Sequence, residues 1–166
     1  TYSGILAGAG RVIKEGTGTL VLNGTNTYTG LTNVNAGTLA VTNNSGLGGA
    51  ASFSQRTDVA TGATLDLRNV SIGNEEIDLT GTATLLTSTG TSSLSGVVFL
   101  SGLTTNVSVS SGAQLTISGE VTDDTTNTTL NKLGAGTLIL TNNTAGYNST
   151  NIDAGVLQIG NGGTSG

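Results

Sequence analysis

The stretch GTLVL at residues 18–22 is followed nineteen residues later by GTLAV at residues 37–41. The same pair returns near the other end of the chain, as GTLIL at 136–140 and GVLQI at 155–159, again nineteen residues apart. A pair of phrases that recurs with its internal spacing intact indicates a repeated structural unit.

The repeated element is a leucine followed two residues later by a second aliphatic residue. Successive leucines, with the weaker match Leu85 included, are 19, 26, 20, 30, 23 and 19 residues apart. A period of about 20–25 residues is typical of a solenoid. The clear matches are Leu20/Leu22, Leu39/Val41, Leu65/Leu67, Leu115/Ile117, Leu138/Leu140 and Leu157/Ile159.

The alternation within each phrase predicts a short strand with one face turned inward. We expect one inward column of leucines, formed by Leu20, Leu39, Leu65, Leu115, Leu138 and Leu157. The residues between the paired aliphatics should point outward: Val21, Ala40, Asp66, Leu86, Thr116, Ile139 and Gln158. A glycine before most phrases suits a corner, and Val34 and Ile152 mark second strands at matching positions.

These features together predict an all-β fold, a parallel β-helix (solenoid) of about seven coils with two or three short strands in each. Thr and Asn should form ladders on its outside. We expect no helix, and residues 74–79 (NEEIDL) should be strand. The irregular spacings of 26 and 30 residues suggest loops near 45–61 and 88–105. An antiparallel β-sandwich is the alternative architecture, although it would not require the nineteen-residue pair.

Composition narrows the classes of function. The net charge is −5, and the five basic residues are scattered without forming a patch, which argues against nucleic-acid binding. No stretch approaches the 18 apolar residues of a membrane-spanning helix. The absence of cysteine excludes disulfides. No signal peptide is visible, so the chain is expected to be cytosolic, or else a mature or excised fragment.

The first segment resembles the autotransporter-associated β-strand repeat, also called the passenger-associated transport repeat. The residues that carry this resemblance are Gly8, Gly10, Val12, Lys14, Gly16, Gly18-Thr19-Leu20, Leu22, Asn26-Thr27-Tyr28, Gly30, Val34 and Gly37-Thr38-Leu39. A second copy matches at Lys132, Gly134, Gly136-Thr137-Leu138 and Gly155, with Tyr147 displaced by one position. We place the copies at 4–49 and 129–163, joined by irregular coils over 50–128, in a single β-helix segment spanning 1–166.

The resemblance implies a type V secretion passenger of a Gram-negative bacterium. Such passengers are right-handed β-helices displayed outside the cell, with an outer-membrane β-barrel downstream. This segment would then be an extracellular piece of a longer protein and would not itself be embedded in the membrane.

Catalysis would require a constellation that the sequence does not supply. A glycosidase needs two carboxyl groups about 5–9.5 Å apart. Asp66 has Ala40 and Leu86 as its expected neighbours one coil away, while Asp58, Glu75, Glu76 and Asp78 are expected in connections. We therefore assign no catalytic residue, no metal ligand and no cofactor.

Two further groups are weighed as ligand sites. The loop at 120–129 offers Glu120, Asp123 and Asp124 to a calcium ion, but lacks a known calcium-loop spacing, so a polar loop is the preferred interpretation. Tyr28 and Tyr147 are expected to brace turns rather than to contact a ligand.

The leading functional hypothesis is an adhesin or passenger stalk that mediates attachment, with itself or with a host or matrix surface ligand as partner. Outward Val21 and Ile139 are expected to add apolar surface for lateral self-association. The first alternative is a stalk without binding activity that assists secretion through the outer membrane. The second is a polysaccharide-degrading β-helix enzyme.

Overall fold

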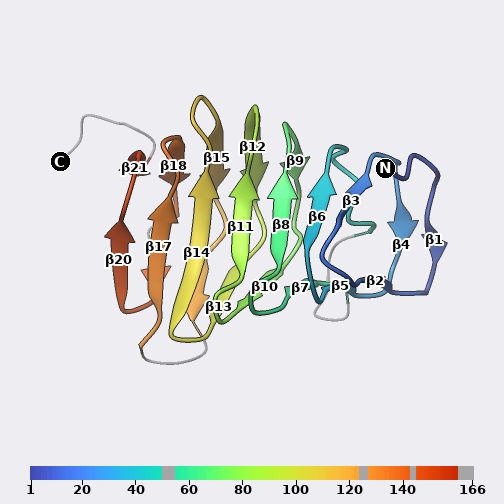
Figure 1. Ribbon diagram of the computed structural model, residues 1–166, viewed down its shortest axis with the longest axis horizontal. Helices are drawn as coiled ribbons and strands as arrows, with labels where there is room; N and C mark the ends of the chain where they lie inside the picture. The colour runs from blue at the N-terminus through green and yellow to red at the C-terminus, as the bar shows by residue number, and fades with distance from the viewer. Residues whose placement is uncertain (50–54, 124–126, 143–144, 161–166) are drawn as a thin grey trace.

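The computed structural model describes residues 1–49, 55–123, 127–142 and 145–160. The strands in these ranges line up in three walls, which the chain visits in a fixed order in each complete coil (Figure 1). Wall 1 contains β2 (Val12–Lys14), β5 (Thr32–Val34), β7 (Thr57–Val59), β10 (Ile77–Thr80), β13 (Val98–Ser101), β16 (Val121–Asp123) and β19 (Ala145–Gly146).

Wall 2 contains β3 (Thr19–Leu22), β6 (Thr38–Val41), β8 (Thr64–Leu67), β11 (Thr84–Thr87), β14 (Thr104–Val109), β17 (Thr129–Leu133) and β20 (Ser149–Ile152). Wall 3 contains β9 (Ser71–Ile72), β12 (Thr91–Leu94), β15 (Gln114–Ile117), β18 (Thr137–Leu140) and β21 (Val156–Ile159). At the N-terminal end β1 (Ala7–Gly8) pairs with β4 (Thr27–Tyr28).

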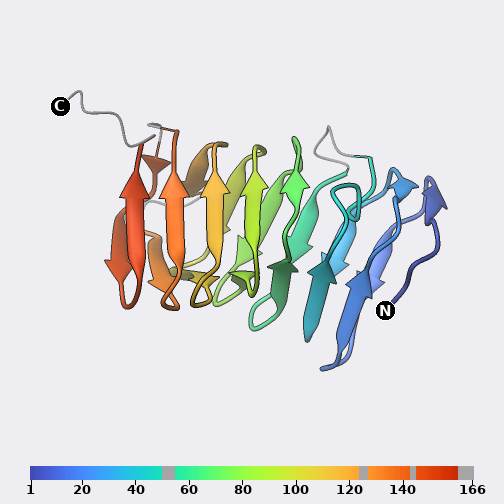
Figure 2. The same cartoon turned by 90° about the horizontal axis from the view of Figure 1, so that it is seen from above.

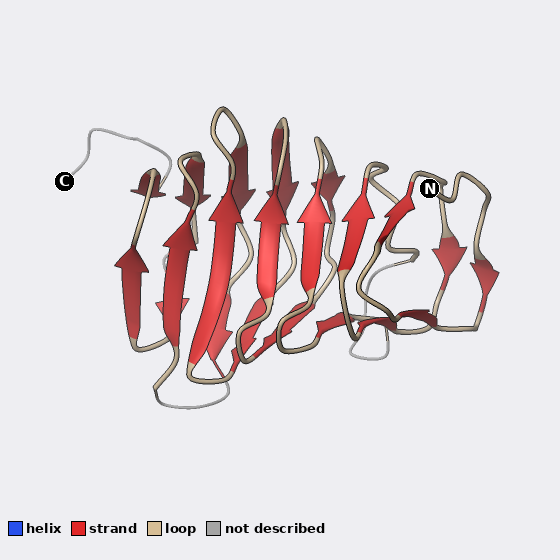
Figure 3. Cartoon of the chain, in the orientation of Figure 1, coloured by secondary structure: helices blue, strands red, loops and turns tan. Residues whose placement is uncertain are grey.

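The molecule is a parallel β-solenoid of about six turns, close to the seven coils expected. Every strand pairing within the described residues is parallel, for example β8 with β11 and β11 with β14, which excludes the antiparallel sandwich. Figure 2 shows the strands of successive coils side by side. In Figure 3 the described residues contain strands and loops but no helix, so they hold no helix able to cross a membrane. Of the strand predicted over 74–79, residues 77–79 lie in β10, whereas 74–76 precede it and are not strand.

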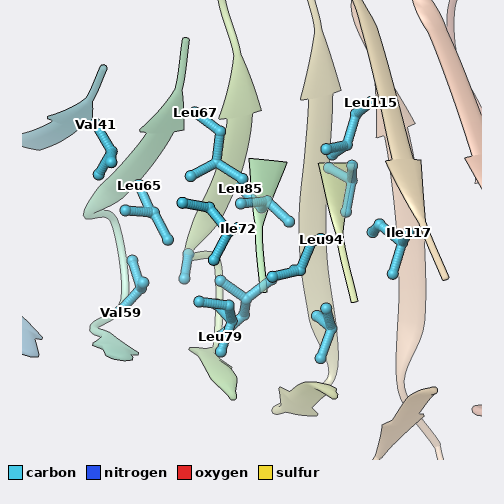
Figure 4. Close-up of a cluster of buried hydrophobic side chains, with 14 of the residues drawn as sticks. Val41, Val59, Leu65, Leu67, Ile72, Leu79, Leu85, Leu94, Leu115 and Ile117 are labelled. Atoms are coloured by element: carbon cyan, nitrogen blue, oxygen red, sulfur yellow. The ribbon is translucent and has the colours of Figure 1, made fainter. Parts of the chain in front are cut away.

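The core is a column of aliphatic side chains enclosed by the three walls (Figure 4). Alternation along each strand places one set of side chains inside, and the parallel register stacks them coil upon coil. On wall 2, Leu39, Leu65 and Leu85 follow one another in register, and each is fully buried. On wall 3, Leu115 stacks on Leu138.

The single leucine column expected from the sequence is wrong. Leu20, Leu39 and Leu65 belong to wall 2, whereas Leu115, Leu138 and Leu157 belong to wall 3. From β3 to β18 the chain makes five coils and then one further strand. All three walls need inward aliphatics, so the phrase GTLxL fits wall 2 in the first copy and wall 3 in the second.

The same shift corrects the expected loop at 88–105. The 30-residue spacing from Leu85 to Leu115 compares strands of different walls, and the register neighbour of Leu85 is Val107, 22 residues on. Strands β12 and β13 lie within this window. The other expected loop, at 45–61, includes residues 50–54, which lie outside the described residues, and also β7.

Corners between walls reuse one turn. The Ala63 N–H donates to the Ala60 carbonyl at 2.9 Å where β7 passes to β8, and the Ala113 N–H donates to Ser110 at 2.9 Å where β14 passes to β15. Each turn has a glycine with positive φ at its third position, 77° at Gly62 and 74° at Gly112, a conformation that favours glycine. The first turn joins walls 1 and 2, and the second joins walls 2 and 3.

Polar ladders run along the outside, as expected. On wall 2 the outward residues of successive strands form one row, Thr19, Thr38, Thr64, Thr84, Asn106, Asn131 and Asn151. The Asn131 amide donates to Asn106 Oδ1 at 3.3 Å, and the Asn151 amide donates to Asn131 Oδ1 at 3.2 Å. We call this row the wall 2 ladder.

Candidate functional site

Two carboxylates lie side by side on wall 1. Asp58 of β7 and Asp78 of β10 are direct register partners, and Arg56 reaches both, with Nε 2.6 Å from Asp58 Oδ1 and Nη2 3.8 Å from Asp78 Oδ2. Asn33 of β5 donates to Asp58 Oδ2 at 3.3 Å. The expectation that both aspartates lie in connections is wrong, and for Asp78 it also disagreed with the strand predicted over 74–79. Each lies between two inward residues of a strand, because Thr-Asp-Val and Ile-Asp-Leu alternate like the other wall strands.

Glu75 lies next to this group but turns inward. Its residue exposure is 1 %, and its Oε1 accepts a hydrogen bond of 2.6 Å from Thr57 Oγ1. Burial raises the pKa of Glu75 from 4.5 to about 7, with the Thr57 hydrogen bond opposing the rise and the charge of Glu76 adding to it. Glu75 therefore keeps a proton at pH values where ordinary glutamates have lost theirs.

Asp66 points outward on β8 yet is 1 % exposed. Arg68 Nε lies 2.7 Å from its Oδ2, and Ser88 donates to the same carboxylate through its hydroxyl at 2.8 Å and its N–H at 3.0 Å. The expected neighbours Ala40 and Leu86 are confirmed by the register. Ala40 is also buried, so outward direction and exposure do not coincide at these two positions.

Asp58, Asp66 and Asp78 each lie beside an arginine. Arg56 contacts both Asp58 and Asp78, and Arg68 contacts Asp66. The Arg56–Asp78 pair and the hydrogen bonds from Ser88 to Asp66 link adjacent coils.

The acidic loop at 120–129 is partly outside the described residues, which exclude 124–126 and therefore Asp124. Asp123 Oδ2 accepts a hydrogen bond from the Thr128 N–H at 3.2 Å. Across 1–49, 55–123, 127–142 and 145–160, no group of three His, Cys, Asp or Glu residues could hold a metal ion.

The two tyrosines of the repeats bind hydroxyls a few residues along the chain. Tyr28 is 2 % exposed, and its hydroxyl lies 2.5 Å from Thr32 Oγ1. Thr150 Oγ1 donates to the Tyr147 hydroxyl at 3.0 Å. Burial raises the pKa of Tyr28 to about 12, so it stays neutral. Each contact joins the tyrosine to a residue of the same coil, so the bracing of a turn against the coil below stays a prediction.

Val21 and Ile139, expected on one lateral face, lie on different walls. Val21 belongs to β3 of wall 2 and Ile139 to β18 of wall 3. The cause is the same as for the leucine column. Each strand of the second repeat lies one wall further along the coil than the equivalent strand of the first repeat. The two side chains therefore do not join into one apolar face.

Lys14 and Lys132 are the only lysines of the chain, and the sequence predicted no site at either of them. Both side chains are buried, with exposures of 6 % and 0 %. Burial lowers the pKa of Lys132 from its ordinary value. The sequence feature that could have pointed to these lysines is the motif Lys-x-Gly, which occurs as KEG and KLG at the same place in each repeat.

Comparison with known proteins agrees with this architecture. The family described as passenger-associated-transport-repeat matches residues 12–41 and 130–159, inside the two expected copies. The chain is 36% identical over 160 residues to a protein of Brucella suis biovar 1 (strain 1330) named adhesin BmaC autotransporter. That match covers 95% of this chain and 4% of the relative. No solved structure is significantly similar to the chain.

Proposed function

We propose that this segment of autotransporter passenger type, a β-solenoid with two passenger-associated transport repeats, is displayed outside a Gram-negative cell, where it serves as a rigid adhesive stalk. The observation that carries the proposal is the similarity, over 95% of the chain, to a stretch of a protein named an adhesin. The attachment that the stalk mediates is to another copy of itself or to a host or matrix surface.

The shape supports this role. The parallel ladders bind each coil to the next along the chain, so the segment is a rod with three long outward faces. The wall 2 ladder offers a row of Thr and Asn side chains with regular spacing, which suits contact with an extended polar surface. Short ion pairs occupy Asp58 and Asp66, which favours a non-enzymatic stalk over a polysaccharide-degrading enzyme.

The test compares two faces with equal charge changes. One variant carries Thr64→Lys, Thr84→Lys and Asn106→Lys on wall 2. The matched control carries Thr91→Lys, Gln114→Lys and Thr137→Lys at outward positions of wall 3. Each set is introduced into the full protein displayed on cells, and attachment to cells, matrix and glycans is measured at equal surface amounts.

We expect the wall 2 set to reduce attachment and the wall 3 set to leave it close to the parent. Sedimentation of the 166-residue chain at several concentrations then separates self-association from binding to a foreign surface. Unchanged attachment with both sets would refute adhesion through these faces.

A second candidate function is assistance to secretion, because the matched family is described as a transport repeat. Under this alternative the segment binds nothing itself, and its folding outside the cell helps the chain through the outer membrane. Deleting 12–41 or 130–159 would then lower the amount of protein at the surface, while attachment per displayed molecule would stay constant.

A further inference from the structure

The two lysines occupy inward positions that elsewhere hold aliphatic residues. Lys14 is in register with Val34 on wall 1, and Lys132 lies between Val107 and Ile152 on wall 2. A charged group at such a position is costly unless every donor finds a partner. An ammonium group has three N–H donors.

Each ammonium group finds three backbone carbonyls, and the pattern is the same in both repeats. Lys14 Nζ donates to Glu15 O at 3.0 Å, Gly16 O at 2.7 Å and Ala36 O at 2.8 Å. Lys132 Nζ donates to Leu133 O at 2.9 Å, Gly134 O at 2.8 Å and Ala154 O at 3.0 Å. The acceptors are one, two and 22 residues after the lysine.

The glycine that follows the distant acceptor is also equivalent. Gly37, with φ 65°, lies against the carbonyls of Gly16 and Gly18, where an added Cβ would come to 2.5 Å from each oxygen. Gly155, with φ 74°, lies in the same way against the carbonyls of Gly134 and Gly136. A side chain at either position would push the two coils apart and separate the lysine from its third carbonyl.

The two constellations are on different walls. Lys14 ends β2 on wall 1, and its carbonyls lie at the corner between walls 1 and 2. Lys132 is on β17 of wall 2, and its carbonyls lie at the corner between walls 2 and 3. The same atoms therefore meet in the same way at two different corners of the solenoid.

We propose that each lysine is a staple that closes the coil following it and makes the repeat a self-contained two-coil unit, usable at any wall. Two of its acceptors are adjacent in sequence and hold the ammonium group as soon as the corner forms. The third acceptor comes within reach only when the 22-residue loop has closed. Its hydrogen bond therefore stabilises the closed coil and offsets part of the entropy lost on closure. This inference goes beyond the proposed function and does not depend on adhesion.

The first test is amine labelling of the intact 166-residue chain with acetic anhydride, followed by mass spectrometry. The N-terminal amine is the internal control, and the chain contains only two other amines. With rates normalised to the N-terminal amine, we expect Lys14 and Lys132 to react at least about a hundredfold more slowly in the folded chain than in the same chain unfolded in urea at the same pH, because in the folded chain they react only when the coil opens. Labelling of both lysines at similar normalised rates in the folded and unfolded chains would overturn the proposal.

The second test replaces each lysine by methionine, which keeps the length of the side chain but not the ammonium group. Hydrogen exchange is then followed at two backbone amides. The Asn35 N–H donates to the backbone carbonyl of Lys14, and the Asp153 N–H donates to that of Lys132. We expect Lys132→Met to raise exchange at Asp153 about tenfold or more, with Asn35 unchanged, and Lys14→Met to do the reverse.

Each variant is thus the matched control for the other. If both methionine variants exchange like the parent at the stapled corners, the lysines are only tolerated in the core and the proposal is wrong. If a methionine variant fails to fold, the labelling rates of the parent still decide, since a staple requires both amines to be protected in the folded chain.

Discussion

Replacing Glu75 by glutamine should remove a pH dependence from the stability of the solenoid. The carboxyl group is 1 % exposed, and burial raises its pKa from 4.5 to about 7. Between these values the folded chain keeps a proton that the unfolded chain has released. The free energy of unfolding therefore falls as the pH rises from about 4.5 to about 7, and this group adds no further change above that.

The size of the effect follows from the two pKa values. They differ by about 2.5 pH units, which corresponds to about 3 kcal/mol of lost stability above pH 7. Glutamine mimics the protonated acid, because its side-chain oxygen can still accept the hydrogen bond from Thr57. We expect Glu75→Gln to match the parent near pH 4.5 and to exceed its free energy of unfolding by up to about 3 kcal/mol at pH 8.

The assay is urea unfolding followed by circular dichroism from pH 4.5 to 8.5. Glu15→Gln, at an exposed position, is the matched control and should keep the pH profile of the parent. The charge of Glu76 also raises the pKa of Glu75, so Glu76→Gln should shift the midpoint of the transition downward. A difference between Glu75→Gln and the parent that stays constant across the pH range would refute the reasoning.

Three further outcomes are expected. Leu138→Asp should lower the free energy of unfolding by about 4 kcal/mol or more, because it buries an unpaired charge, whereas Ile139→Asp next to it should cost less than about 1 kcal/mol; equal melting temperatures would contradict this assignment of wall 3. Gly155→Ala should cost about 1–3 kcal/mol in urea unfolding, because of its positive φ and the carbonyls against it. Limited proteolysis should cut first within 45–61, and a first cut inside 134–159 would count against the stability of the repeats.

Much of the fold could be predicted from local patterns. Alternating aliphatics in GTLVL and its relatives predicted short strands, and the recurring nineteen-residue pair predicted stacked coils. The ladders of Thr and Asn followed from parallel stacking of similar strands. These features depend on a few neighbouring residues, so one sequence contains the information for them.

The wall on which each strand lies could not be read in this way. GTLVL and GTLIL have the same inward residues, yet they lie on walls 2 and 3. Every wall presents aliphatics to one shared core, and the corners at 60–63 and 110–113 use the same turn at different edges. Nothing within the phrase distinguishes one wall from another. The wall on which the second copy lies therefore depends on the number of strands between the two copies.

The carboxylates show the same division. Their types and positions were visible in the sequence, but the pairing of Asp58 with Asp78 required β7 and β10 to be neighbours in register. The buried state of Glu75 and of both lysines depended on contacts 18 and 22 residues away. Local sequence determined the strands, the corners and the existence of coils. Only the tertiary structure decided on which wall each strand lies and which residues of successive coils are neighbours. Burial and register belong to residues that meet only when whole turns of the solenoid have closed.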